Sequence, residues 1–132
     1  MLDASIAACW CFEDEHDSRA DAAAALLLAS GSAIVPLIFW FEVRNVVLIG
    51  MRRGRTSEAS MIEWLAKTMR APITLDTLPP EELVFALAQR HRLTFYDAAY
   101  LELAQRENIA LATLDQVLAR AAVAERVPLI GS

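Results

Sequence analysis

Short apolar runs alternate with longer helical patterns along the whole chain, and this alternation constrains the fold more than any other feature. The short runs are rich in Ile, Leu, Val and Ala, which is typical of strands buried on both faces. Parallel strands need a crossover between them, and a helix usually provides it. The pattern therefore predicts an α/β fold in which helices cover both faces of a parallel sheet. The expected strands are residues 1–3, 33–35, 73–75, 109–112 and 127–130.

Local start and stop signals predict the helices between these strands. Thr56 or Ser57 can cap one helix, and Thr94 can cap another. Gly31 ends an Ala-rich helix, because glycine readily takes the left-handed conformation that follows a helix. A turn is expected between the first strand and that helix. The expected helices are residues 21–30, 39–51, 57–70, 81–92, 94–103 and a last one that opens at Thr113 and Asp115.

Length and composition are those of one globular domain. The chain has 132 residues, of which 56% are hydrophobic and 22% charged, so residues 1–132 are expected to form a single domain with a sizeable core. The longest uncharged apolar stretch, residues 33–41, is interrupted by Pro36 and is far shorter than the roughly 20 residues that span a bilayer. An acid stands at position 3, where a signal peptide would carry basic residues. A cytoplasmic protein without a membrane span is therefore expected.

The formal net charge of −5 would normally count against a nucleic-acid partner, since phosphate binding relies on Lys and Arg. Bound divalent cations would offset several of the acids, and basic residues can still be concentrated locally. Arg52, Arg53 and Arg55 form such a cluster. It is either a solvated helix end, which the helix dipole favours, or a contact for a substrate or partner. The sequence leaves both interpretations open.

Cys9 and Cys11 flank Trp10 with a Cys-x-Cys spacing, which differs from the Cys-x-x-Cys of zinc knuckles and redox sites. Free cysteines are most often buried, so a buried structural pair is expected. The two histidines, His16 and His91, lack the paired spacing that zinc sites use. Any metal is therefore expected to have oxygen ligands.

Four acids lie in or against apolar stretches, namely Asp3, Glu42, Asp97 and Asp115. An ionised carboxylate drawn toward a core must be paired, hydrogen-bonded or metal-bound, or its pKa shifts until it is neutral. Two of the four, Asp3 and Asp115, follow expected strands, and the ligands of parallel sheets bind beyond the carboxyl ends of the strands. Oxygen-bearing neighbours of the acids are Ser5, Asn45, Thr94 and Thr113. Carboxylates and hydroxyls suit Mg²⁺ or Mn²⁺, so the pattern predicts a metal site.

Each acid also has a purely structural interpretation. Asp3 can cap the turn after the first strand, and Asp115 can cap the last helix. Thr94 followed by Asp97 imitates a capping box, in which two side chains satisfy amides at a helix start. Glu42 can be an exposed position on a mostly buried helix. One acid alone does not decide between a cap and a ligand, and only the joint pattern favours the metal site.

Four segments, in order along essentially the whole chain, resemble the PIN-domain ribonucleases, and most closely the VapC-type toxins of toxin-antitoxin pairs. They are Leu-Asp-Ala-Ser at 2–5, Phe-Glu-Val-Arg-Asn at 41–45, Leu-Thr-Phe-Tyr-Asp-Ala-Ala-Tyr-Leu-Glu-Leu-Ala at 93–104 and Leu-Ala-Thr-Leu-Asp at 111–115. The resemblance implies a three-layer α/β/α sandwich with a central, mostly parallel sheet. It also implies a Mg²⁺- or Mn²⁺-dependent endoribonuclease that acts on RNA and is inhibited by a small VapB-type antitoxin.

Residue by residue, the resemblance assigns roles to the acids. Asp3, Glu42, Asp97 and Asp115 match the family's acidic quartet. Two of them, Asp3 and Asp97, would be the firmest metal ligands, and the other two would complete the shell or orient the attacking water. Polar positions that support the quartet are matched by Ser5, Asn45 and Thr113.

The start of the chain departs from the family pattern. Only Met1 and Leu2 precede Asp3, whereas a strand of about five residues is typical. Either the first strand is cut short here or translation starts upstream, and we expect the second.

Two other classes compete with a PIN nuclease. Phosphoacceptor domains of the receiver or haloacid-dehalogenase type also place Asp after parallel strands. This chain lacks their Asp-x-Asp-x-Thr after the first strand, and its single lysine, Lys67, falls on an expected helix. The second alternative is a catalytically degenerate PIN module that binds RNA or protein.

Large apolar side chains are numerous for a domain of this size. They include Trp10, Trp40, Trp64, Met51, Met61 and Met69. Such an excess indicates either plain core packing or a surface that a homodimer or an antitoxin covers.

Overall fold

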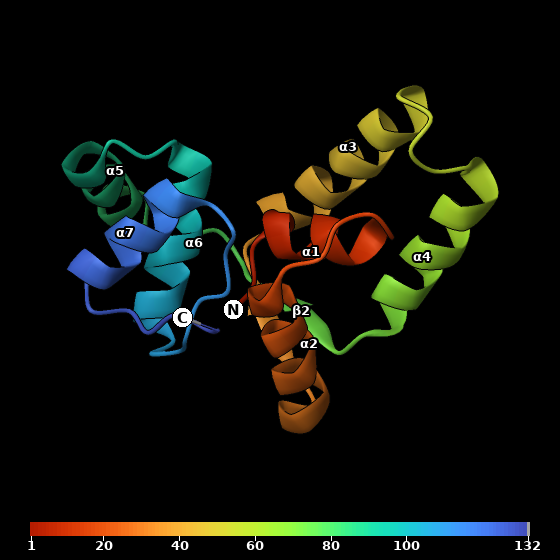
Figure 1. Cartoon of the computed structure of the whole chain (residues 1–132). Helices are drawn as coiled ribbons and strands as arrows, with labels where there is room; N and C mark the ends of the chain where they lie inside the picture. Colours follow the sequence, from red (N-terminus) through yellow and green to blue (C-terminus); the bar gives the residue numbers. More distant parts are fainter. Residues whose placement is uncertain (132) are drawn as a thin grey trace.

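The computed structural model describes residues 1–131 of the chain without the side chain of Met69, so the expectation for that side chain lies outside the described residues. Helices dominate this range, and two short strands are interspersed among them (Figure 1). The elements are α1 (Ala4–Cys11), α2 (Ser18–Ser30), β1 (Ala33–Val35), α3 (Ile38–Arg52), α4 (Glu58–Arg70), β2 (Ile73–Leu75), α5 (Glu81–His91), α6 (Phe95–Arg106) and α7 (Gln116–Ala124). Across residues 1–131, every helix is too short or too polar to cross a membrane.

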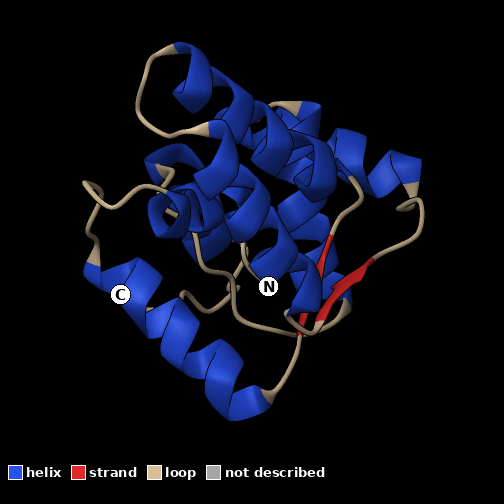
Figure 2. Cartoon of the chain, turned by 90° about the vertical axis from the view of Figure 1, so that its right-hand side faces the viewer, coloured by secondary structure: helices blue, strands red, loops and turns tan. Residues whose placement is uncertain are grey.

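The two strands form a parallel pair, as the alternation predicts. They run in register from Ala33 opposite Ile73 to Val35 opposite Leu75. Figure 2 shows this pair as the red element within a largely helical molecule. The strands expected at 33–35 and 73–75 are therefore confirmed, along with their parallel orientation.

The other expected strands contribute isolated parallel bridges instead of full strands. Leu2 pairs with Ala112, and Leu111 pairs with Leu129. The Leu111 amide donates to the Pro128 carbonyl at 2.8 Å. Proline has no amide hydrogen of its own to return to the ladder, which helps to keep this pairing short.

Helix α1 occupies a stretch where a turn is expected. Asp3 caps it, and its carboxylate accepts from the amides of Ser5 and Ile6. The helix is short and contains Cys-Trp-Cys, so its sequence carries little helix signal beyond the cap. Burial inside the fold stabilises it instead, because most helix stability in proteins comes from packing. Cys9 is buried but Cys11 is only half-buried, and both thiols are free, so the expected buried pair is half correct.

The first residue is drawn into the protein. Met1 is only 8% exposed, and its ammonium group donates to the Ala110 carbonyl at 3.1 Å. Burial lowers the pKa of this ammonium group. A cavity of about 490 Å³ lies beside it, lined in part by Leu2, Ile34 and Thr74. The expected upstream start stays a prediction.

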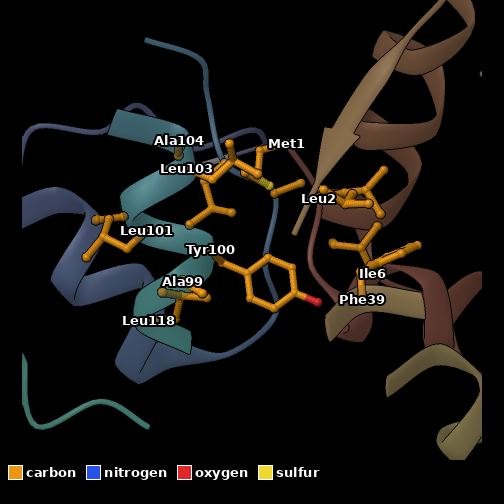
Figure 3. Packing of buried hydrophobic residues seen from close by; sticks show 14 of the residues in the cluster. Met1, Leu2, Ile6, Phe39, Ala99, Tyr100, Leu101, Leu103, Ala104 and Leu118 are labelled. Atoms are coloured by element: carbon orange, nitrogen blue, oxygen red, sulfur yellow. The ribbon is translucent and has the colours of Figure 1, made fainter. Parts of the chain in front are cut away.

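Helix α6 is the centre of the hydrophobic core. Its residues from Ala98 to Ala104 are all buried. Helices α5 and α7 pack against it, while α1 packs against α2 and α3 (Figure 1). Figure 3 shows side chains of α6 facing those of Met1, Leu2 and Ile6. The core therefore joins the C-terminal helices to the N-terminal segment.

Arg55 links the end of α3 to the loop after α1. Its guanidinium lies 4.0 Å above the Phe12 ring and 2.7 Å from the Glu15 carboxylate. Arg52 and Arg53 are exposed at the end of α3. Arg55 is also exposed but is engaged in these contacts, so the arginine cluster is partly structural, and the contact role stays a prediction for Arg52 and Arg53.

A buried acid on α6 depends on one arginine for its compensation. Glu102 is 2% exposed, and the Arg106 guanidinium donates to it at 2.9 Å. The same guanidinium reaches Asp76, just after β2, at 2.5 Å. These two carboxylates raise the pKa of Arg106 further above its ordinary value. Arg106 therefore stays charged and connects α6 to the end of the parallel pair.

Candidate active site

Asp3 lies at the end of the first pairing segment, held by hydroxyl groups from two parts of the chain. Ser5 Oγ donates to its Oδ1 at 2.5 Å, and Thr113 Oγ1 donates to its Oδ2. Asp3 as a whole residue is only 5% exposed. Burial raises the pKa of Asp3, although these hydrogen bonds oppose the rise. The position and orientation of Asp3 are therefore set on both of its oxygens.

The same hydroxyl groups also connect the two segments to each other. Ser5 Oγ accepts from the Leu114 amide at 2.8 Å, and Thr113 Oγ1 accepts from the Asp115 amide at 3.0 Å. These contacts lie immediately beyond the parallel bridge between Leu2 and Ala112. Asp3 and the segment that begins at Thr113 therefore meet just beyond this bridge, while the site expected at Asp3 and Asp115 stays a prediction.

Glu42 comes from α3 and is half-buried. Its Oε2 accepts from the Tyr100 hydroxyl at 2.5 Å. Burial raises the pKa of Glu42, the Tyr100 hydrogen bond opposes this, and the charges of Asp97 and Asp3 raise it further. A charge influences a pKa only at short range, so Asp3 and Asp97 each lie within electrostatic range of Glu42.

Asp97 is half-buried in the first turn of α6. Thr94 Oγ1 accepts from the Asp97 amide at 3.0 Å and donates to its Oδ2 at 2.7 Å. The helix cap is thus made by the Thr94 hydroxyl, not by the carboxylate of Asp97. Because one carboxylate oxygen takes no part in this pair, the observed cap is compatible with a ligand role.

Asp115 and Asn45 lie farther from the buried centre. Both residues are exposed. Asp115 caps α7, since its Oδ1 accepts from the Leu118 amide at 2.8 Å. Asn45 follows Glu42 by three residues on α3, which places the two on one face of the helix. The structural interpretation of Asp115 as a cap is therefore correct, and a catalytic role for it stays a prediction.

Whether the carboxylates of the four acids suit a divalent cation depends on how many of them must coordinate the ion directly. In the described part of the chain, no three acidic, histidine or cysteine side chains are close enough to hold one ion together. Mg²⁺ does not require such a cage, since it usually keeps several waters and binds through one or two carboxylates. The oxygen donors near one another are Glu42 and the two acids that raise its pKa, Asp3 and Asp97. The donor set therefore fits Mg²⁺ or Mn²⁺ with part of the shell left to water.

Tyr100 belongs to the site although the sequence did not single it out. Its side chain is 1% exposed, and its hydroxyl is hydrogen-bonded to Glu42. Burial and the Glu42 hydrogen bond raise the pKa of the Tyr100 phenol, so it stays protonated. A usable signal did exist: Tyr100 follows Asp97 by three residues, and a buried tyrosine hydroxyl normally needs a polar partner.

The fold is an α/β sandwich of the PIN type, as expected. The chain belongs to the PIN domain family, which matches residues 1–124. The crystal structure of PAE2754 from Pyrobaculum aerophilum is similar, with a TM-score of 0.69 and 25% sequence identity, over 91% of this chain and 82% of that one.

The chain is also similar in sequence to Ribonuclease VapC3 of Pyrobaculum aerophilum. The two are 40% identical over 82 residues. The match covers 60% of this chain and 63% of VapC3, which is less than two thirds of that relative's length. The family resemblance read from the four sequence segments is confirmed.

Proposed function

We propose that residues 1–132 form one nuclease domain that cleaves RNA in the cytoplasm as the toxin of a toxin-antitoxin pair. The observation that carries this proposal is the buried Asp3 carboxylate, which two hydroxyls hold within electrostatic range of Glu42. Similarity to a ribonuclease named VapC3 supports the same activity. Both the metal dependence and the catalytic roles belong to the proposal.

The residues that would hold Mg²⁺ or Mn²⁺ are Asp3 and Asp97, with Glu42 and Asp115 completing the shell or orienting water. When bound, the ion supplies a water of lowered pKa as nucleophile and stabilises the charge on the leaving oxygen. Asn45 would contribute a polar contact on the α3 side of the site.

The chain's own contribution is orientation. Ser5 and Thr113 donate to different oxygens of Asp3, so the carboxylate plane cannot rotate freely. Thr94 restrains Oδ2 of Asp97 in the same manner. Preorganised ligands need little rearrangement when a cation and an RNA phosphate arrive, which is the general benefit of a fixed constellation.

Removal of divalent cations should abolish the activity. We expect purified protein to cleave single-stranded RNA with Mg²⁺ or Mn²⁺ and to lose cleavage in excess chelator, because in this proposal the bound ion activates the attacking water and stabilises the leaving oxygen. Readdition of the ion should restore it. Calorimetric titration with Mn²⁺ separates the alternatives: RNA binding without cation binding or cleavage indicates a degenerate PIN module, and full activity in chelator contradicts metal dependence.

A VapB-like antitoxin and a second copy of the chain are the proposed partners. Exposed apolar side chains on α3 and α4 support a covered surface: Phe41 is 58% exposed and Ile62 is 58% exposed. We expect light scattering to show a homodimer, and co-expression with the neighbouring gene to yield a complex with a small protein. Ile62→Glu should weaken assembly, while Leu78→Glu, at an 84% exposed position before α5, serves as control. A monomer at high concentration with no co-purifying protein would contradict this proposal.

A further inference from the structure

Tyr100 connects three segments that supply acids to the site. It lies on α6, three residues after Asp97, so the two residues share one face of that helix. Its hydroxyl donates to Oε2 of Glu42 on α3 at 2.5 Å. The backbone of Ala4, the residue that follows Asp3, acts on the pKa of this phenol and so lies near its oxygen. The Tyr100 oxygen is therefore bonded to the Glu42 carboxylate and lies close to the backbone next to Asp3.

The Tyr100 ring makes this connection rigid. It is 1% exposed and packs inside the core cluster that includes Ile6 and Phe39. Figure 3 shows the ring extending from α6 with its oxygen directed toward the side where Ile6 and Phe39 lie. A phenol of ordinary pKa, about 10, is protonated at neutral pH and so donates to a carboxylate. A hydrogen bond to a charged group is among the stronger kinds, which suits it to fixing a side chain.

The arrangement divides the two oxygens of Glu42. Oε2 is engaged by Tyr100, while the hydrogen bonds of the described residues leave Oε1 unengaged. Glu42 has three rotatable side-chain bonds before its carboxylate, so an unrestrained Glu42 would sample many positions relative to Asp3. The hydrogen bond from Tyr100 in the core restricts these rotations of Glu42. In metal sites generally, residues that are hydrogen-bonded to the ligands orient them in the same way.

We propose that Tyr100 is a positioning residue that holds Glu42 at a fixed place relative to Asp3 for cation binding. It does not contact the substrate; it acts through Glu42. The inference rests on the proposed nuclease function, and it assigns a role to a residue that could otherwise be a simple core side chain.

The test is Tyr100→Phe, which removes the oxygen and keeps the ring. We expect the folded structure to be retained, Mn²⁺ affinity by calorimetry and kcat for RNA cleavage to fall about 10- to 100-fold, and KM for RNA to stay unchanged. Tyr96→Phe is the matched control, since Tyr96 lies on the same helix and is 55% exposed. It should behave as the wild type does.

A double-variant comparison distinguishes positioning from plain core packing. If Tyr100 acts through Glu42, then Tyr100→Phe should have little further effect on Mn²⁺ affinity in a Glu42→Gln background, within about twofold. Additive losses would overturn the inference, and so would unchanged Mn²⁺ affinity and kcat in the single variant. Loss of folded structure in Tyr100→Phe would also overturn it, because the oxygen would then serve the fold. Wild-type protein that neither binds Mn²⁺ nor cleaves RNA would overturn the proposed function as well.

Discussion

Asp97→Asn should abolish RNA cleavage while leaving the protein folded. The substitution removes the charge of a proposed direct ligand, and loss of a mere supporting partner already costs about 10- to 100-fold, so we expect a loss of at least about 100-fold in kcat. The helix start should survive, because the cap is the Thr94 hydroxyl and an Asn side-chain oxygen can still accept from that hydroxyl. Cleavage of single-stranded RNA in Mg²⁺ and thermal unfolding are the two measurements.

The control for this variant is Asp21→Asn, which removes one negative charge from an exposed position on α2. It should cleave at the wild-type rate. If Asp97 served only the capping motif, then Asp97→Asn would lower stability slightly and leave cleavage unchanged, which would remove Asp97 from the proposed site. Asp97 suits this experiment better than Asp3, since Asp3 also caps α1 and binds Thr113, so its loss would disturb the fold.

Arg106→Met should destabilise the protein by about 3 kcal/mol, because it strands the Glu102 carboxylate without its compensating charge. The Glu102 side chain is 2% exposed, whereas the Arg106 side chain is 32% exposed. Water can therefore reach part of this ion pair, so the expected loss of stability lies near the lower end of the range for broken buried pairs. Breaking the contact to Asp76 adds to the loss at the end of β2. Urea unfolding monitored by circular dichroism measures the change.

Two variants accompany Arg106→Met. Arg120→Met, at an exposed position on α7, should change stability by no more than about 0.5 kcal/mol. Glu102→Gln combined with Arg106→Met should recover part of the loss, because a neutral amide is less costly to leave in the core than an unpaired carboxylate. A loss below about 1 kcal/mol for the single variant would mean that solvent already compensates Glu102.

The sequence predicted best the features that depend on near neighbours. Ser57 and Thr94 cap their helices as expected, and Gly31 ends α2 in the left-handed conformation. Each of these signals operates within one helical turn, so it is legible in a short window of sequence. Helix α1 was missed because its local signal is weak. Its cap residue, Asp3, is also a proposed ligand, and the helix is stabilised by burial in the fold, which a short window of sequence does not reveal.

By itself, then, the sequence determined the helices from α2 to α7, the parallel pair of β1 and β2, and the four acids that the family resemblance assigns to the site. Only the tertiary structure decided which oxygens meet. Thr113 reaches Asp3 across most of the chain, and Tyr100 reaches Glu42 from another helix. These pairings depend on how strands and helices pack in three dimensions, and no local spacing encodes that. The physical reason lies in conformational entropy. A helix cap needs only a few neighbouring residues to become ordered, whereas a contact between distant segments forms only when the whole core has folded.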